Sequence, residues 1–148
     1  MPNIGELLKK AREKRGWTRE QAAANMDFLE VRTLAAYENG EYMPKWDVIP
    51  LIARAYGDKR MLFKCLQENP VYRAILPPLK ERTLEGATCN VVNKLARVRA
   101  HIETASGIVS DGAVDAGELP DWRKITEDVT LLIAALLEFA AADGRWEQ

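Results

Sequence analysis

The chain has 148 residues, of which 47% are hydrophobic and 29% charged, and its formal net charge is −1. This composition is that of an ordinary globular protein, long enough for one or two small domains that bury their own cores. The charge balance excludes a strongly basic protein. Because no apolar run is long enough to span a membrane and Met1-Pro2-Asn3 does not begin a signal peptide, we expect a soluble, cytoplasmic protein.

The N-terminal part of the chain begins with two predicted helices. The first, over about residues 4–14, is capped by Asn3 and ends at Gly16. The second begins at Thr18, whose hydroxyl and the side chain of Gln21 suit a capping box. The residues expected to face inward on these two helices are Ile4, Leu7, Leu8, Ala11, Ala22, Ala23 and Met26.

A third helix is predicted over about residues 30–37, with Leu34 as its inward anchor. Asp27-Phe28 separates it from the second helix and is expected to form a tight turn. Asn39-Gly40 is a strong signal for the end of the third helix.

Two further helices complete the predicted N-terminal domain, residues 1–69. Asp47 is expected to be the N-cap of the fourth helix, because this start leaves Pro50 in the first turn, where no amide hydrogen bond is lost. The fifth helix is predicted over about residues 58–68. The inward residues are expected to be Ile49, Ile52, Ala53 and Tyr56 on the fourth helix and Leu62, Phe63 and Leu66 on the fifth.

The C-terminal part predicts a proline-containing connector, residues 70–81, followed by a helical hairpin, residues 82–148. The arms are expected at about 82–106 and 120–142, with the glycine-rich segment 107–120 as the turn. The apolar stripes are Val91, Leu95, Val98, Ile102 and Ala105 on the first arm and Trp122, Ile125, Val129, Leu132, Leu136 and Phe139 on the second. The second arm is apolar on more than one face, so it must pack on the N-terminal domain, on a second subunit, or on both.

The run from Thr18 to Pro44 has the layout of a helix-turn-helix unit. With Tyr37-Glu38-Asn39-Gly40, Pro44 and Gly57 at their usual spacing, residues 4–57 resemble the lambda-repressor-like, or XRE-type, family. The resemblance implies an all-α chain whose five-helix domain binds double-stranded DNA and regulates transcription. A net charge of +2 on the first 60 residues, against −3 on the rest, fits a DNA-binding domain with a tail that does not bind DNA.

One departure from the family pattern indicates a subset. The stretch from Thr18 to Tyr37 is one residue longer than usual and lacks the turn glycine. Together with Arg19-Glu20-Gln21-Ala22-Ala23, and with Asp111-Gly112-Ala113-Val114-Asp115 before Glu118, it resembles phage-like bacterial regulators that carry a helical C-terminal hairpin. This resemblance implies a bacterial cytoplasmic protein that associates with the nucleoid when bound, and leaves the register of the third helix open.

The third helix supplies the candidate base-reading residues, because the first turn and a half of a recognition helix reaches the floor of the major groove. They are Glu30, Val31, Arg32, Thr33, Ala35 and Ala36. Arg32 can donate twice to guanine, while Val31 and Thr33 can contact a thymine methyl group. Glu30 could accept from cytosine N4 or could cap the helix, and we favour the cap.

Phosphate contacts must supply much of the affinity for DNA, because Ala35 and Ala36 can make few contacts that distinguish one base from another. The candidates are Arg19, Tyr37, Asn39, Tyr42 and Lys45, and more weakly Lys14 and Arg15. Arg19 lies at a helix N-terminus, where backbone amides could meet the same phosphate. Tyr37 could equally be an aromatic residue at the edge of the core, and Lys14 and Arg15 are better explained as solvated.

No signal for an enzyme, a metal site or a cofactor is present. His101 has no accompanying nucleophile motif, and Asp111, Asp115 and Glu118 do not have the spacing of a calcium loop, so Asp115 with Glu118 predicts a helix cap. Cys65 and Cys89 are expected to be buried or semi-buried free thiols. We expect a homodimer that binds a palindromic or repeated site through the N-terminal domain. The alternative is an adaptor or antitoxin-like module that binds a regulatory protein and DNA only weakly.

Overall fold

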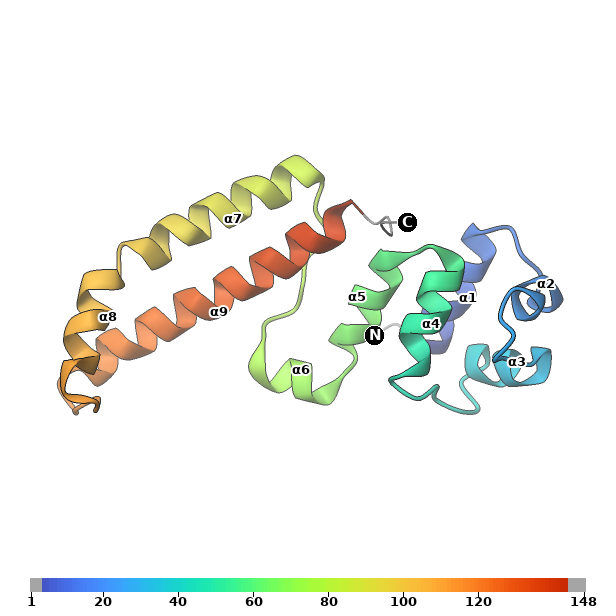
Figure 1. The fold of residues 1–148 in the computed structure, drawn as a ribbon, viewed down its shortest axis with the longest axis horizontal. Coiled ribbons are helices and arrows are strands. Elements are labelled where there is room, and N and C mark those ends of the chain that lie inside the picture. The colour runs from blue at the N-terminus through green and yellow to red at the C-terminus, as the bar shows by residue number, and fades with distance from the viewer. Residues whose placement is uncertain (1–3, 144–148) are drawn as a thin grey trace. The chain divides into compact units, whose positions relative to one another are not determined.

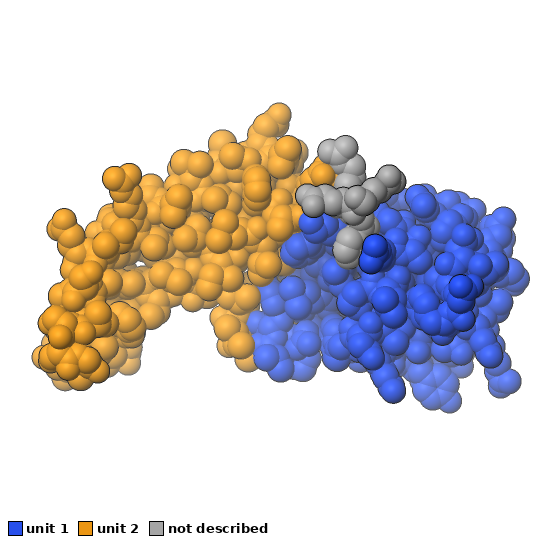
Figure 2. All heavy atoms as spheres, in the orientation of Figure 1, with its two compact units in different colours: residues 1–72, 144–148 blue, residues 73–143 orange. Residues whose placement is uncertain are grey.

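A computed structural model describes residues 4–143 of the chain. Every regular element in this range is a helix, which confirms the prediction of an all-α protein (Figure 1). The chain divides into two compact units, one ending at Tyr72 and the other over residues 73–143 (Figure 2).

The N-terminal unit contains the five predicted helices. They are α1 (Ile4–Lys14), α2 (Arg19–Ala24), α3 (Val31–Glu38), α4 (Val48–Tyr56) and α5 (Lys59–Gln67), followed by α6 (Pro70–Ile75). The capping box of α2 is confirmed, since Thr18 Oγ1 accepts from the Gln21 amide at 3.2 Å and Gln21 Oε1 accepts from the Thr18 amide at 2.8 Å. The expected cap Asn3 lies outside the described residues.

A single apolar core joins the helices of this unit. Its members are Ile4, Leu7, Leu8, Ala11, Ala22, Met26, Leu29, Leu34, Ile49, Ile52, Ala53, Tyr56, Met61 and Cys65. The inward stripes predicted for α1 and α4 are therefore confirmed. The prediction for α5 is wrong in part, because Met61 and Cys65 are its buried anchors while Leu62, Phe63 and Leu66 are only partly buried. Burial raises the pKa of the Cys65 thiol to about 12.

The longer turn between α2 and α3 settles the register of α3. Asp27 and Phe28 project to the surface, and the chain returns inward at Leu29, which is only 7% exposed. From this anchor α3 turns Leu34 and Glu38 toward the interior of the unit. The turn thus exposes Asp27 and Phe28, while Leu29, Leu34 and Glu38 face the interior.

The start of α4 is where the sequence predicts it, but the capping is different. Asp47 is the N-cap residue, and Pro50 lies in the first turn. The Asp47 side chain makes no capping hydrogen bond. The backbone carbonyl of Lys45 instead accepts from the amides of Val48 and Ile49, at 3.0 and 3.3 Å.

The C-terminal unit is built on α7 (Leu84–Arg99) and α9 (Leu119–Ala142), which pack side by side (Figure 1). The predicted first arm is two helices, because α7 ends at Arg99 and α8 (Ile102–Ile108) begins after His101. We call α7, α8 and α9 the C-terminal hairpin. Asp115 accepts at Oδ1 from the amides of Gly117 and Glu118, and Glu118 Oε2 accepts from the Asp115 amide. The two side chains therefore pair as predicted, but they close the turn before α9, whose N-cap residue is Glu118 and not Asp115.

The apolar stripes predicted for the hairpin are wrong in part. The side of α7 that meets α9 carries Ala87, Val91, Lys94 and Val98, followed by His101 between α7 and α8, and the matching side of α9 carries Ile125, Asp128, Leu132, Ala135 and Glu138. Leu95 and Ile102 are more than half exposed, and Leu136 is 48% exposed. Cys89, expected to be at least half-buried, is exposed. The contact between these helices combines apolar residues such as Ile125 and Leu132 with small and polar ones such as Ala135 and Asp128, and several larger apolar side chains are left outside it.

Residues 73–83 lie against the hairpin and are tied to it by one carboxylate. Glu138 Oε1 accepts from the Lys80 amide at 2.8 Å, and Oε2 accepts from Arg82 Nε at 2.6 Å and from Asn90 Nδ2 at 3.0 Å. Within the part of the chain that the structure describes, no helix is long and apolar enough to cross a membrane.

Candidate nucleic-acid interface

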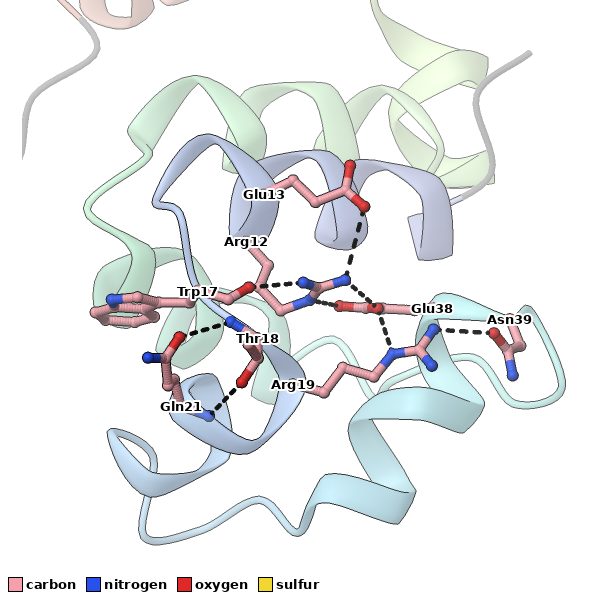
Figure 3. A network of polar contacts seen from close by, with 8 residues as sticks. All are labelled: Arg12, Glu13, Trp17, Thr18, Arg19, Gln21, Glu38 and Asn39. Carbon is pink, nitrogen blue, oxygen red and sulfur yellow. Dashed lines mark hydrogen bonds and ion pairs between the residues drawn. The ribbon is translucent and has the colours of Figure 1, made fainter.

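A buried carboxylate holds α1, α2 and α3 together beneath the exposed side of the helix-turn-helix. Glu38, whose side chain is fully buried, accepts from Arg12 Nε at 2.6 Å and from Arg12 Nη2 at 3.0 Å. Arg12 also donates from Nη1 to the Trp17 carbonyl oxygen at 2.7 Å (Figure 3). The end of α1, the start of α2 and the end of α3 therefore share one charge-assisted network.

Arg19 joins this network from the surface. Its Nε donates to Glu38 Oε2 at 2.8 Å and its Nη2 donates to Asn39 Oδ1 at 3.2 Å (Figure 3). One third of the Arg19 side chain remains exposed. Asn39 in turn donates from Nδ2 to Glu41 Oε1 at 3.1 Å. Arg19 and Asn39, two of the residues predicted to contact phosphate, are thus oriented by partners within the protein itself.

The ionisation of Glu38 is set by two opposing effects. Burial acts to raise the pKa of Glu38, but the hydrogen bonds from Arg12 and Arg19 outweigh it and hold that pKa below its ordinary value. The same pairing raises the pKa of Arg12. The network is therefore charged at neutral pH, with two guanidinium groups around one carboxylate.

The beginning of α3 presents a side with few polar groups. Glu30, Val31 and Arg32 are exposed, whereas Thr33, Ala35 and Ala36 are half-buried. Glu30 is the N-cap residue of α3, as the favoured interpretation predicts. Its side chain, however, makes no capping hydrogen bond. Arg32 has no hydrogen bond or ion pair with any described residue. Its five N–H donors are thus available to a ligand.

The remaining residues predicted to contact phosphate differ in exposure and in the contacts that they make within the fold. Tyr42 and Lys45, in the loop after α3, are exposed. Tyr37 packs partly buried against the core, as one of the two sequence interpretations had it. Lys14 donates to Asp58 Oδ2 at 3.1 Å, and the Arg15 guanidinium lies 5.2 Å from the centre of the Trp17 ring, so both have partners within the fold.

Sequence reasoning missed Arg12 and Glu38 as a pair. The signal in the sequence was Arg12 at the edge of the inward stripe of α1, where a charge needs a partner. Nothing local identified that partner, because 26 residues separate the two. The described residues contain no group of three or more His, Cys, Asp or Glu side chains that could hold a metal ion.

The α2–turn–α3 pair, capped at Thr18 and braced by Glu38 against α1, defines a helix-turn-helix domain of the all-α class. Residues 3–59 match a known family described as a helix-turn-helix domain. Neither the curated proteins nor the solved structures contain a match to this chain.

Proposed function

We propose that this chain is a sequence-specific DNA-binding regulator of transcription, with α3 as the recognition helix in the major groove. The observation that carries the proposal is the exposed, unpaired Arg32 on the first turn of α3, within a matched helix-turn-helix domain. Arg32 would donate twice to a guanine, and Val31 and Thr33 would contact a thymine methyl group. Glu30, Ala35 and Ala36 complete this face.

Around α3, phosphate contacts would set the position of the domain. Lys45 and Tyr42 are exposed in the loop after α3, and Arg19 is held at the start of α2 by Glu38. A guanidinium that is already oriented loses less entropy on binding phosphate. Asn39 and Tyr37 would extend the phosphate contacts along the end of α3.

We further propose that the chain acts as a homodimer on a palindromic or repeated site, and that it belongs to the phage-like bacterial regulators. The support for the dimer is the apolar surface that the C-terminal hairpin leaves exposed. The support for the phage-like group is the longer turn at Asp27-Phe28 and the acidic turn before α9. A two-fold dimer would place two recognition helices about one helical turn of DNA apart.

Binding-site selection from random DNA, followed by titration of the selected site, tests the proposal. The expected result is a short motif repeated at one spacing, with affinity that falls by orders of magnitude between low and moderate salt. Arg32→Ala should weaken binding by about 1–3 kcal/mol and relax the preference at one base pair. Lys10→Ala, an exposed change on α1, is the control and should leave the sequence preference unchanged.

The alternative is a protein-binding adaptor that keeps this fold and binds DNA weakly. It is favoured by the small number of long polar side chains on α3 and by the internal partners of Arg19 and Asn39. Selection that yields no motif, together with the same weak binding by wild type and Arg32→Ala, would contradict the regulator and support the adaptor.

A further inference from the structure

One side of the C-terminal hairpin carries large apolar side chains that nothing in the described chain covers. They are Val92 and Leu95 on α7, Ile102 on α8, and Val129, Ile133, Leu136 and Phe139 on α9, each between 36% and 60% exposed. We call this set the apolar face of the hairpin.

Helix geometry places the six residues on α7 and α9 on the same side. Each follows by one position a residue of the contact between the helices, as Val92 follows Val91 and Leu136 follows Ala135. One position along an α-helix is a rotation of about 100°. Because α7 and α9 run in opposite directions, their rotations are opposite when seen from one end. Side chains one step beyond the contact therefore emerge on one common side.

The other side of the hairpin differs mainly in its cover. It carries Asn93 and Arg97 on α7, and Glu127, Thr130 and Leu131 on α9, where Leu131, Ala134 and Leu137 are partly or fully buried. Glu127 and Thr130 line an open groove together with residues 73–77, so the connector of the same chain lies along that side. The apolar side chains are thus gathered where the chain itself provides no cover.

The extent of the apolar face is that of a protein interface. Seven side chains of this size and exposure present on the order of 500 Å², in the upper range for the largest apolar patch on a monomer. A standard interface buries roughly 800 Å² on each partner, of which the fully buried centre is the apolar part. The face therefore suffices for the centre of an interface with another helical surface.

The charges on this side of α7 indicate what that surface is. Glu85 lies seven residues before Val92, and Arg99 lies seven residues after it. Seven residues are about two helical turns, so the three side chains lie along the same side of α7. A two-fold axis passing Val92 across the helix would bring Glu85 of one copy to Arg99 of another, twice. The contacts of Asn90 with Glu138 and of His101 with Asp128 place Val92 opposite Leu136, so the same axis would pass Leu136.

We propose that the apolar face binds a second copy of this chain as an antiparallel four-helix bundle, α7 against α7 and α9 against α9, with the two-fold axis at Val92 and Leu136. This inference deepens the proposed dimer and rests on it. The interface is isologous, because the same patch serves both copies.

A disulfide cross-link tests the position of the axis. In full-length protein with Cys89→Ser, Val92→Cys should form a covalent dimer under mild oxidation, because the two thiols face each other across the axis. Asn93→Cys, one position further on the polar side, is the matched control and should cross-link at least 10-fold more slowly. Equal cross-linking of the two variants, or none by Val92→Cys, overturns the proposed axis.

Sedimentation tests the charge pairing. Glu85→Arg should weaken the dimer at least 10-fold, and adding Arg99→Glu should restore it, with helix content by circular dichroism unchanged throughout. If the chain is a dimer whose affinity is unchanged by these substitutions and by Leu136→Glu, the apolar face is not the dimer interface. The proposal of a dimeric regulator would then remain. A wild-type monomer at high micromolar concentration overturns both the face and the dimer, whereas DNA binding is judged separately by site selection.

Discussion

Glu38 in the N-terminal unit and Glu138 in the C-terminal hairpin are both buried carboxylates that accept hydrogen bonds from arginine. Their surroundings differ. Glu38 lies beside a core that includes Leu8, Met26 and Leu34, all at most 2% exposed. Glu138 lies among small residues such as Ala135 and Ala142, and the larger side chain of Leu136 beside it is about half exposed.

The difference teaches how an apolar helix is to be interpreted. On α1 and α4 of the N-terminal unit the apolar stripes and the buried faces coincide, and the unit is stabilised mainly by burial of its own core. In the hairpin the contact between α7 and α9 contains Asp128 and Glu138 beside apolar residues such as Ile125, and part of the apolar stripes lies outside that contact. Several large apolar side chains of the hairpin are therefore exposed, and polar hydrogen bonds take a larger part in holding its helices together.

The largest expected effect comes from removing the charge of Glu38. Glu38→Gln leaves Arg12, whose side chain is 10% exposed, without its buried counter-charge, and should lower the free energy of unfolding by about 3–5 kcal/mol. Urea denaturation followed by circular dichroism measures it. Glu13→Gln is the control, because that carboxylate lies 3.8 Å from the same guanidinium but is 52% exposed, and it should cost less than about 1 kcal/mol.

Acid should reproduce part of this loss. Because the pKa of Glu38 is lowered in the folded protein, the network contributes fully above the ordinary value of 4.5 and is lost as pH falls from there through the folded pKa. Thermal unfolding between pH 6 and pH 3 should therefore show a decline that is smaller in Glu38→Gln. An equal decline in the variant would show that the network is not its source.

A slightly smaller effect is expected where α1 crosses α3. A Cβ at Gly5 would overlap the Tyr37 carbonyl oxygen and come within 3.0 Å of that of Glu38. Gly5→Ala should therefore cost about 2–3 kcal/mol through overpacking. Gly107→Ala in α8, where a Cβ meets nothing, should instead be neutral or stabilising by up to about 1 kcal/mol. Equal changes in stability for Gly5→Ala and Gly107→Ala would contradict the close approach of Gly5 to the end of α3.

The hairpin should respond more weakly to loss of its own carboxylate. Glu138→Gln places an NH₂ group against either the Lys80 amide or the Arg82 and Asn90 donors, and should cost about 1.5–2 kcal/mol, within the range for hydrogen bonds to charged groups. Denaturation under the conditions used for Glu38→Gln gives the comparison. A loss as large as that of Glu38→Gln would remove the proposed contrast between the two units.

The smallest effect should come from the hydroxyl of Tyr56. This oxygen is buried without a hydrogen-bond partner among the described residues, while the ring packs edge-on against Trp17 with centroids 6.1 Å apart. Tyr56→Phe keeps the ring and removes an unpaired polar group, so stability should change by less than about 1 kcal/mol, toward greater stability. A clear destabilisation would reveal a partner for the hydroxyl and weaken the account of a purely apolar core.

The sequence by itself determined the local features of this protein. The Thr18–Gln21 capping box, the helix ends at Gly16 and Gly57, and the position of Pro50 in the first turn of α4 all follow from hydrogen bonds and backbone angles within a few residues. For the same reason it gave correct inward stripes for α1 and α4, where one side of a short helix is unambiguously apolar.

Only the tertiary structure decided which partners meet and which apolar sides are covered. Arg12 and Glu38 are 26 residues apart, and Arg82 and Glu138 are 56 apart, so no local pattern links them. Leu29 as the anchor of the longer turn, and the contact between α7 and α9 through Ala87, Asp128 and Ala135, likewise depend on how whole helices pack. Helical periodicity shows that a side is apolar, but what covers that side depends on the shape and charge of its neighbour.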